Sequence, residues 1–322
     1  MATTGCSPCA SDDGVIMAHS PHRPFDLVIL DLDGTILDLY QPAPIAPAVQ
    51  KAIAAVQAAG IPVTIGTGRT FEYVRQYVAP LRITTPVVTT QGAVIGDPRT
   101  GRVLDRVAMP LPLARRAAAW IDEHDYVTAF YFSDEEGRTH IVQNRNGPEE
   151  AFYDHVFGTP RTYQERLTAL LADETVTRRW MPLKFLIVCD AVADDGQGGY
   201  GDTEEEDKIV AELEAALSPG LYITRTHPRL VEGTPQAADK GEGLRRLCRL
   251  LGIDPARVLA IGDSDNDIPM LEAAGYAVAM GNASPGVRAV ADWVAPSLSE
   301  DGVARALERL ILAPLSAGSD PA

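Results

Sequence analysis

The sequence is poor in positive charge. Lysine and arginine number 28 against 44 aspartate and glutamate residues, which gives a formal net charge of -16. No local cluster of basic residues interrupts this excess, so neither a nucleic-acid partner nor an anionic membrane surface is expected. The same acidity would repel a phosphorylated ligand at long range. Such a ligand would need cations close to its binding site, for example a bound metal ion.

Long apolar runs are also missing. No segment approaches the roughly 18 apolar residues that a membrane-spanning helix needs. Residues 1–24 hold one short apolar piece, residues 14–18, with no basic region before it, so no secretory signal is expected. These absences predict a cytoplasmic protein without a membrane partner. Two of the four cysteines, Cys189 and Cys248, lie in an expected strand and an expected helix, where free cysteine acts as a small buried apolar residue.

The other two cysteines lie near the N-terminus. Cys6 and Cys9 have the spacing C-x-x-C, and His19 and His22 follow them. This set is similar to a degenerate zinc site of two cysteines and two histidines, although the loop is shorter and the histidines are closer together than in zinc fingers. The alternative is a disordered polar leader over residues 1–24. We also expect a disordered tail over residues 313–322.

The chain of 322 residues is longer than one hydrophobic core usually serves, so two structural units are expected. Residues 25–97 and 234–312 alternate short apolar strands with amphipathic helices, which is typical of an α/β fold with a parallel sheet. Residues 98–233 differ. They contain strands at 128–132, 139–143, 184–188 and 221–225 and helices at 113–123, 163–172 and 204–217, without regular alternation. This pattern predicts an inserted α+β domain with an antiparallel sheet.

Two acidic residues follow the first apolar strand. Residues 28–30 are apolar, and Asp31 and Asp33 come after them, with Gly34 supplying a turn signal. In a parallel sheet this position is the carboxyl end of a strand, where ligands bind. A divalent cation or a shared proton would relieve the repulsion between the two carboxylates. Taken alone, the same residues could equally form an ordinary Asp-Gly turn.

The next apolar strand, at residues 62–66, leads into a second group of polar residues. Thr67, Gly68 and Arg69 offer a hydroxyl, backbone N–H groups and a guanidinium, which together suit a phosphate oxygen. Thr67 or Thr70 could instead be a plain helix N-cap.

A second acidic cluster follows the strand at residues 258–262. Asp263 and Asp267 lie in it, and Lys240 opens the helix that precedes this strand. One parallel sheet would bring these residues to the same edge as Asp31. Several carboxylates with few imidazoles suit Mg²⁺ better than zinc, with waters and a substrate phosphate completing the coordination.

In order along the chain, four motifs resemble those of the haloacid dehalogenase superfamily. They are Asp31-Leu-Asp33-Gly34-Thr35, Thr67 in Ile65-Gly-Thr-Gly-Arg, Lys240 in Lys-Gly-Glu-Gly, and Gly262-Asp263-Ser-Asp-Asn266-Asp267. The insert between the second and third motifs is similar to the large α/β cap of Cof-type phosphatases, subclass IIB. The resemblance covers residues 25–312. It implies a Rossmann-like catalytic core with a cap that selects the substrate.

The resemblance also implies roles for the motif residues. Asp31 would be the nucleophile that receives the phosphoryl group, and Asp33 the general acid that protonates the leaving alcohol and later activates water. Lys240 would pair with Asp31 and the phosphate. The phosphate would be bound by Thr67, Gly68, Asn266 and Lys240. Mg²⁺ would be held by Asp31, the backbone carbonyl of Asp33, Asp263 and Asp267, the last acting through water or Lys240.

One stretch departs from the relatives. Gln91-Gly92-Ala93 stands where they often carry Asn-Gly-Ala, so a substrate contact at Gln91 does not carry over. The resemblance favours a Mg²⁺-dependent phosphatase acting on a small phosphorylated metabolite such as a sugar phosphate. A binding or regulatory protein without turnover is the alternative. A phosphomutase is less favoured, because the interval between the first two motifs holds one expected helix and no room for a helical cap. Nothing in the sequence indicates an oligomeric state.

Overall fold

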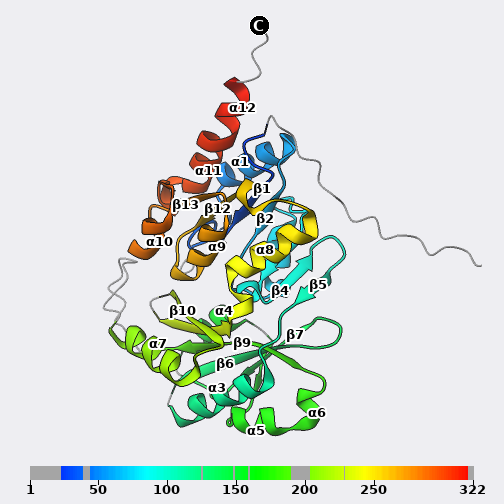
Figure 1. The fold of residues 1–322 in the computed structure, drawn as a ribbon, viewed down its shortest axis with the longest axis vertical. Helices are drawn as coiled ribbons and strands as arrows, with labels where there is room; N and C mark the ends of the chain where they lie inside the picture. The colour runs from blue at the N-terminus through cyan, green and yellow to red at the C-terminus, as the bar shows by residue number, and fades with distance from the viewer. Residues whose placement is uncertain are drawn as a thin grey trace, which may run out of the picture.

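The computed structural model describes residues 23–38, 44–124, 126–147, 149–158, 160–189, 204–227 and 229–317. These residues form two units, which Figure 1 shows one above the other. The four candidate zinc ligands Cys6, Cys9, His19 and His22 lie outside the described residues, as does nearly all of the predicted leader.

A five-stranded parallel sheet forms the centre of the first unit. Its order is β14-β13-β12-β1-β2, and every pairing in it is parallel. Leu30 pairs with Ile261 on one side and with Ile65 on the other, so three strands end at the same edge. The predicted parallel-sheet core is thereby confirmed. The strands are β1 (Leu27–Leu30), β2 (Val63–Ile65), β12 (Val258–Gly262), β13 (Tyr276–Ala279) and β14 (Trp293–Val294).

Strand β1 is apolar on both faces, and helices cover both sides of the sheet. Val28 and Leu30 pack in one apolar cluster with α1 (Pro47–Ala58) and α11 (Gly302–Leu307). Leu27 and Ile29 pack in another with α8 (Lys240–Leu251) and α9 (Ile268–Ala273). Successive side chains of a strand point to opposite faces, so an uninterrupted apolar run requires two covered faces. Helices α2 (Phe71–Val78) and α10 (Pro285–Val290) complete this unit.

Three antiparallel strands extend the first unit beside β2. They are β3 (Val87–Thr89), β4 (Val94–Asp97) and β5 (Arg102–Arg106), and a parallel bridge between Gly66 and Val88 joins β3 to the end of β2. The predicted division after residue 97 falls between β4 and β5. The one after residue 233 falls within β11 (Leu230–Pro235). Both boundaries stay predictions.

The second unit is a six-stranded sheet in the order β10-β11-β9-β6-β7-β8. It is antiparallel except for the β7–β8 pair. The four strands predicted in this region are present, whereas β11 and α4 were not predicted. The remaining strands are β6 (Val127–Ser133), β7 (Thr139–Gln143), β8 (Thr162–Tyr163), β9 (Met181–Val188) and β10 (Leu221–His227), and the helices are α3 (Leu111–Glu123), α4 (Glu150–Phe157), α5 (Leu167–Ala172), α6 (Glu174–Thr177) and α7 (Glu204–Leu217).

The two faces of this sheet serve different purposes. Phe185 and Ile187 of β9 pack against α3, α5 and α7, and α3 and α5 lie on the side away from the first unit (Figure 1). Lys184 and Leu186 alternate with them and line a pocket that both units share. The sheet therefore presents one face to its own core and the other to the parallel sheet's edge.

The helix predicted at residues 163–172 begins only at Leu167. Tyr163 belongs to β8 and pairs with Gln143. The carboxylate of Asp122 in α3 accepts the N–H groups of Leu167 and Thr168 at 2.9 and 3.0 Å, which caps the first turn. The prediction was wrong for residues 163–166 because the group that sets the start of this helix lies far away in the sequence.

The predicted disordered tail is wrong for residues 313–317, which form α12 (Ala313–Ala317). The helix continues past Leu312 because Leu315 packs against the core and the Ser316 hydroxyl donates to the Leu312 carbonyl at 2.9 Å. Cys189 and Cys248 are buried, as predicted. None of the helices in the described part of the chain has the length and apolar content of a membrane span.

Candidate functional site

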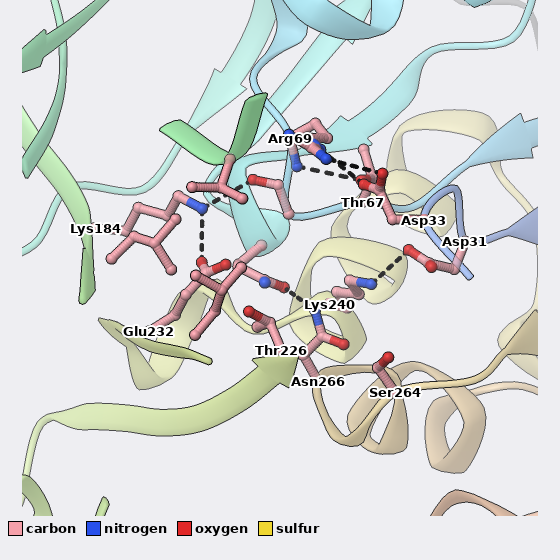
Figure 2. A pocket seen from close by; sticks show the side chains of 15 residues that line it. Asp31, Asp33, Thr67, Arg69, Lys184, Thr226, Glu232, Lys240, Ser264 and Asn266 are labelled. Atoms are coloured by element: carbon pink, nitrogen blue, oxygen red, sulfur yellow. Dashed lines mark hydrogen bonds and ion pairs between the residues drawn. The ribbon is translucent and has the colours of Figure 1, made fainter. Parts of the chain in front are cut away.

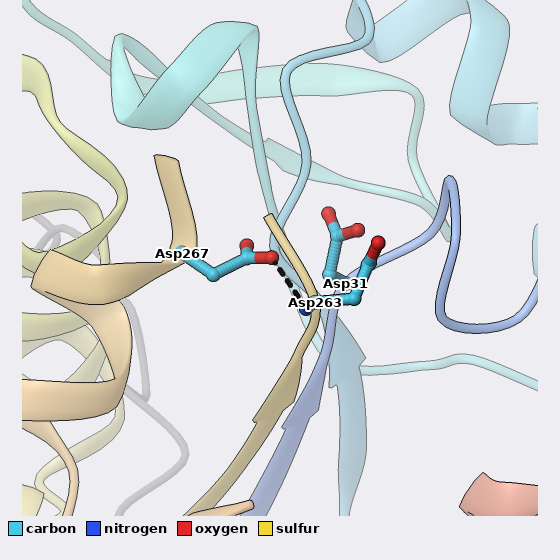
Figure 3. A group of neighbouring side chains, drawn as sticks. All are labelled: Asp31, Asp263 and Asp267. Carbon is cyan, nitrogen blue, oxygen red and sulfur yellow. Dashed lines mark hydrogen bonds between the residues drawn. The ribbon is translucent and has the colours of Figure 1, made fainter. Parts of the chain in front are cut away.

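Polar side chains from three strand ends meet in a pocket at the edge of the parallel sheet (Figure 2). Asp31 follows β1, and its backbone N–H donates to the Ile261 carbonyl of β12 at 2.9 Å. Asp263 follows β12, and Thr67 follows Gly66 after β2. The carboxyl oxygens of Asp31, Asp263 and Asp267 lie within 4.8 Å of one another (Figure 3). Residues 28–31 and 258–267, far apart in sequence, thus share one acidic cluster.

The three carboxyl groups are hidden from water, with residue exposures of 3% for Asp31, 5% for Asp263 and 0% for Asp267. Burial, reinforced by the charge of Asp267, raises the pKa of Asp31 well above its ordinary value and that of Asp263 to about 7. A bound divalent cation would favour the ionised forms and lower both pKa values. Because every donor is a carboxylate oxygen, the residues fit Mg²⁺.

Lys240 supplies the cation inside this cluster. It is the first residue of α8, whose N-cap Asp239 accepts the N–H of Glu242 at 2.7 Å. Its Nζ lies 2.7 Å from Asp31 Oδ1 and 2.5 Å from Asp267 Oδ1. Burial opposes its charge, but the two carboxylates prevail and raise the pKa of Lys240. One ammonium against three carboxylates leaves excess negative charge, which a further cation would neutralise.

Backbone groups hold the second acidic loop in shape. Asp267 Oδ2 accepts the N–H groups of Asp263 and Ser264 at 2.9 and 3.0 Å. The Thr35 hydroxyl donates to Asp263 Oδ1 at 2.8 Å. Asp267 therefore orients the loop, and Thr35 from the first motif orients Asp263.

Asp33 is directed away from the acidic cluster. Its carboxylate forms two bonds with Arg69, Nε to Oδ2 at 2.8 Å and Nη2 to Oδ1 at 3.0 Å. Arg69 also donates to the backbone carbonyl of His155 in α4, so it joins Asp33 to the second unit. Although burial raises the pKa of Asp33, the guanidinium outweighs this and holds that pKa below its ordinary value. Asp33 is thus ionised at neutral pH here, whereas the predicted general acid carries a proton.

The loop after β2 separates the two threonines. The Thr70 hydroxyl accepts the N–H of Tyr73 at 3.3 Å and is the N-cap of α2. Thr67 does not cap this helix; it lines the pocket and accepts the N–H of Arg69 at 3.2 Å. A Cβ at Gly68 would meet Gln91 Nε2 at 2.5 Å, so a larger residue there would require the Gln91 amide to move.

Two amide side chains meet beside this loop. Asn266 Nδ2 donates to Gln91 Oε1 at 3.1 Å. The remaining amide atoms, Gln91 Nε2 and Asn266 Oδ1, are buried and make no hydrogen bond within the described ranges of the chain. Asn266 and Gln91 both lie in the pocket wall, and phosphate binding by Asn266 stays a prediction.

The second unit closes the pocket. Lys184 Nζ lies 2.6 Å from Glu232 Oε2 and donates to the Gly68 carbonyl at 2.9 Å, so the ion pair reaches across to the first unit. Both residues are at most 4% exposed. Thr226, Leu186 and Leu230 line the same wall.

Neither the ion pair of Lys184 with Glu232 nor the pairing of Arg69 with Asp33 was predicted from the sequence. A charged residue within the apolar strand 184–188 was the available signal for Lys184, because an unpaired buried lysine is rare. Glu232 lies in β11, a strand that was not predicted. For Arg69 the loop composition suggested a phosphate contact, and only the fold reveals its bond to Asp33.

Comparison with known proteins agrees with this geometry. A family model described as haloacid dehalogenase-like hydrolase matches residues 28–307. The phosphatase YwpJ of Bacillus subtilis is 28% identical over 307 residues, covering 88% of this chain and 99% of its own.

Solved structures show the same fold. A haloacid dehalogenase-like hydrolase from B. subtilis superposes with a TM-score of 0.74 at 25% identity, covering 89% of this chain and 100% of its own. A protein described as a sugar phosphatase of subclass IIB superposes with a TM-score of 0.70 at 24% identity, covering 88% of this chain and 98% of its own.

Proposed function

The chain belongs to the haloacid dehalogenase-like hydrolase family and is a phosphoric monoester hydrolase of it; we propose that it hydrolyses a small sugar phosphate through an aspartyl phosphate on Asp31. The observation that carries this proposal is the contact of buried Lys240 with Asp31 inside a cluster of three carboxylates. The Lys240 ammonium opposes the effect of burial and favours the ionised form of Asp31, and bound Mg²⁺ would favour it further. An ionised carboxylate can attack phosphorus and form the covalent intermediate.

The residues around Asp31 would position the phosphoryl group. Lys240 would stabilise negative charge on it, and the Thr67 hydroxyl and the Gly68 backbone would donate hydrogen bonds to its oxygens. Mg²⁺ would be held by Asp31, Asp263 and the backbone carbonyl of Asp33, with Asp267 in support, and would supply further positive charge for the transferring group.

Asp33 would protonate the leaving oxygen and later take a proton from water. It can do so only if its bond to Arg69 loosens, because this bond favours the ionised carboxylate. A phosphate dianion beside Thr67 would compete for the guanidinium. With Arg69 drawn away, burial would be opposed only by the smaller effects of His155 and Lys240 and would raise the pKa of Asp33, so that substrate binding itself prepares the acid.

The first test is phosphate release from a panel of phosphate monoesters in the presence of Mg²⁺, with EDTA as the control. Acid quenching with radiolabelled substrate should trap label on the wild-type protein and none on Asp31→Asn. Asp33→Asn should still be labelled but should lose the label slowly. Full activity of Asp31→Asn, or identical behaviour of the two variants, contradicts the proposal.

The two other functions considered from the sequence give different results in this test. A binding protein would hold phosphate esters tightly without releasing phosphate. A phosphomutase would return the phosphoryl group to a second hydroxyl instead of to water. Between β1 and β2 the described residues contain one helix, α1, which gives no support to a helical cap at that position.

A further inference from the structure

Besides Lys240, Thr67 and Gly68, which are proposed to hold the phosphoryl group, the pocket contains further hydrogen-bonding groups, among them Asn266, which the family resemblance assigned to the phosphate. Gln91 Nε2, Asn266 Oδ1 and Thr226 Oγ1 are buried without a partner among the described residues. Glu232 bonds to Lys184 through Oε2, and its other carboxylate oxygen, Oε1, makes no hydrogen bond with the described residues. Figure 2 shows Glu232, Thr226 and Asn266 on the side of the pocket away from Arg69 and Asp33. Buried polar atoms without partners are costly and call for a ligand or water to satisfy them.

Building on the proposed phosphatase activity, we propose that these four side chains form a leaving-group subsite that selects small, uncharged polyhydroxyl groups. The subsite consists of Gln91, Thr226, Glu232 and Asn266. With the phosphate at Asp31 and Lys240 and the bridging oxygen near Asp33, the rest of the substrate would extend toward this subsite.

The chemistry of the four groups favours hydroxyls. Glu232 Oε1 and Asn266 Oδ1 accept hydrogen bonds, Gln91 Nε2 donates, and the Thr226 hydroxyl does either. Exchanging the orientations of both amides keeps their mutual bond and still leaves one donor and one acceptor. Adjacent hydroxyls, which donate and accept, satisfy such a mixed set, whereas a carboxylate can only accept and would leave Glu232 Oε1 and Asn266 Oδ1 without a donor.

Lys184 neutralises the negative charge of Glu232, so this wall selects a leaving group by its hydrogen-bonding groups. Its ammonium neutralises Glu232 at 2.6 Å and is itself satisfied by the Gly68 carbonyl and the face of Tyr131, 4.7 Å from the ring centre. The pair therefore offers a fixed acceptor oxygen with little net field. A cationic leaving group gains less here than it would beside an unpaired carboxylate.

Gln91 is held in place by a strained backbone conformation. Thr90 and Gln91 have φ values of 54° and 57°, in the left-handed region that residues with a Cβ seldom adopt. Such strain concentrates at functional sites, where the surrounding structure enforces a side-chain position. The cavity, of about 60 Å³, is lined by residues of both units, so a bound leaving group would contact both.

The test compares kcat/KM for glucose 6-phosphate, phosphoglycolate and p-nitrophenyl phosphate in Thr226→Val and Glu232→Gln. Thr226→Val keeps the shape and removes a hydroxyl that has no partner in the part of the chain that the structure describes, so it should fold normally. Thr234→Val is the matched control, because the Thr234 hydroxyl is also buried and unpartnered but does not line the pocket. Each subsite variant should lower kcat/KM for the sugar phosphate about 10-fold to 100-fold and that for p-nitrophenyl phosphate less than threefold.

Further outcomes separate the subsite from the proposed activity. The wild type should prefer glucose 6-phosphate to phosphoglycolate, and Glu232→Gln should narrow this preference because it leaves the Lys184 ammonium without its carboxylate and so favours a carboxylate on the substrate. Equal losses on all three esters, or an effect of Thr234→Val as large as that of Thr226→Val, would overturn the subsite while leaving the phosphatase intact. Absence of turnover on every ester would overturn the phosphatase. The subsite would then be judged by whether glucose 6-phosphate raises the Tm of the wild type more than that of Thr226→Val.

Discussion

Removal of the buried lysine at the acidic cluster tests the electrostatic reasoning most directly. In Lys240→Met, Asp31 and Asp267 lose a cation 2.7 and 2.5 Å away, at a position that is 1% exposed. Breaking a buried ion pair from one side costs about 3–5 kcal/mol, because the remaining charge is left without compensation. We therefore expect urea unfolding in EDTA to show a loss of about that size.

Magnesium should reverse part of this loss. A ligand at about 100 times its Kd stabilises the native state by about 2.7 kcal/mol. Without Lys240 the carboxylates attract Mg²⁺ more strongly, so the stability that Lys240→Met gains from Mg²⁺ should exceed the wild-type gain by at least about 1 kcal/mol.

Lys184→Met is the matched control for this experiment. Lys184 is equally buried and also paired with a carboxylate, Glu232, but it lies outside the acidic cluster. Its loss should be similar in EDTA, and its gain from Mg²⁺ should equal that of the wild type. If Lys240→Met gains no more from Mg²⁺ than Lys184→Met, Lys240 does not share the metal site's charge and the reasoning is refuted.

Three further predictions concern pH and shape. Arg69→Gln removes the guanidinium that lowers the pKa of Asp33 in the free enzyme, so the alkaline limb of the kcat/KM–pH profile for an alkyl phosphate should move to higher pH; an unmoved limb would argue against Asp33 as the acid. Burial opposes ionisation of Asp134, but hydrogen bonds from His140 and Arg138 lower its pKa to about 2. The ionised carboxylate therefore stabilises the folded protein above pH 4, and this stabilisation is lost as the pH falls toward 2. Asp134→Asn should therefore cost about 2 kcal/mol in urea unfolding at pH 6, and the difference should shrink below pH 4. Gly34→Ala places a Cβ 2.1 Å from Asp263 Oδ2 at a φ of 85°, so calorimetry should show Mg²⁺ affinity reduced at least about tenfold; an unchanged affinity would exclude Asp263 as a ligand.

The sequence predicted the fold class of the second unit but only some of its strands and helices. Alternating apolar residues predicted β6, β7 and β9, because burial of one face imposes a period of two. The start of α5 was placed too early, since Asp122, which caps it, lies 45 residues before Leu167. Caps supplied from another element leave no local signal.

The sequence by itself determined the order of the motifs and the chemistry of the acidic cluster. Apolar runs such as residues 28–30 and 258–262 require burial on both faces, and this places Asp31 and Asp263 at strand ends on one edge. Only the tertiary structure decided what each polar group faces. Arg69 could have bound phosphate but bonds Asp33, and Gln91 meets Asn266 across 175 residues of chain. Such pairings depend on the packing of whole units against each other, which no local pattern of residues records.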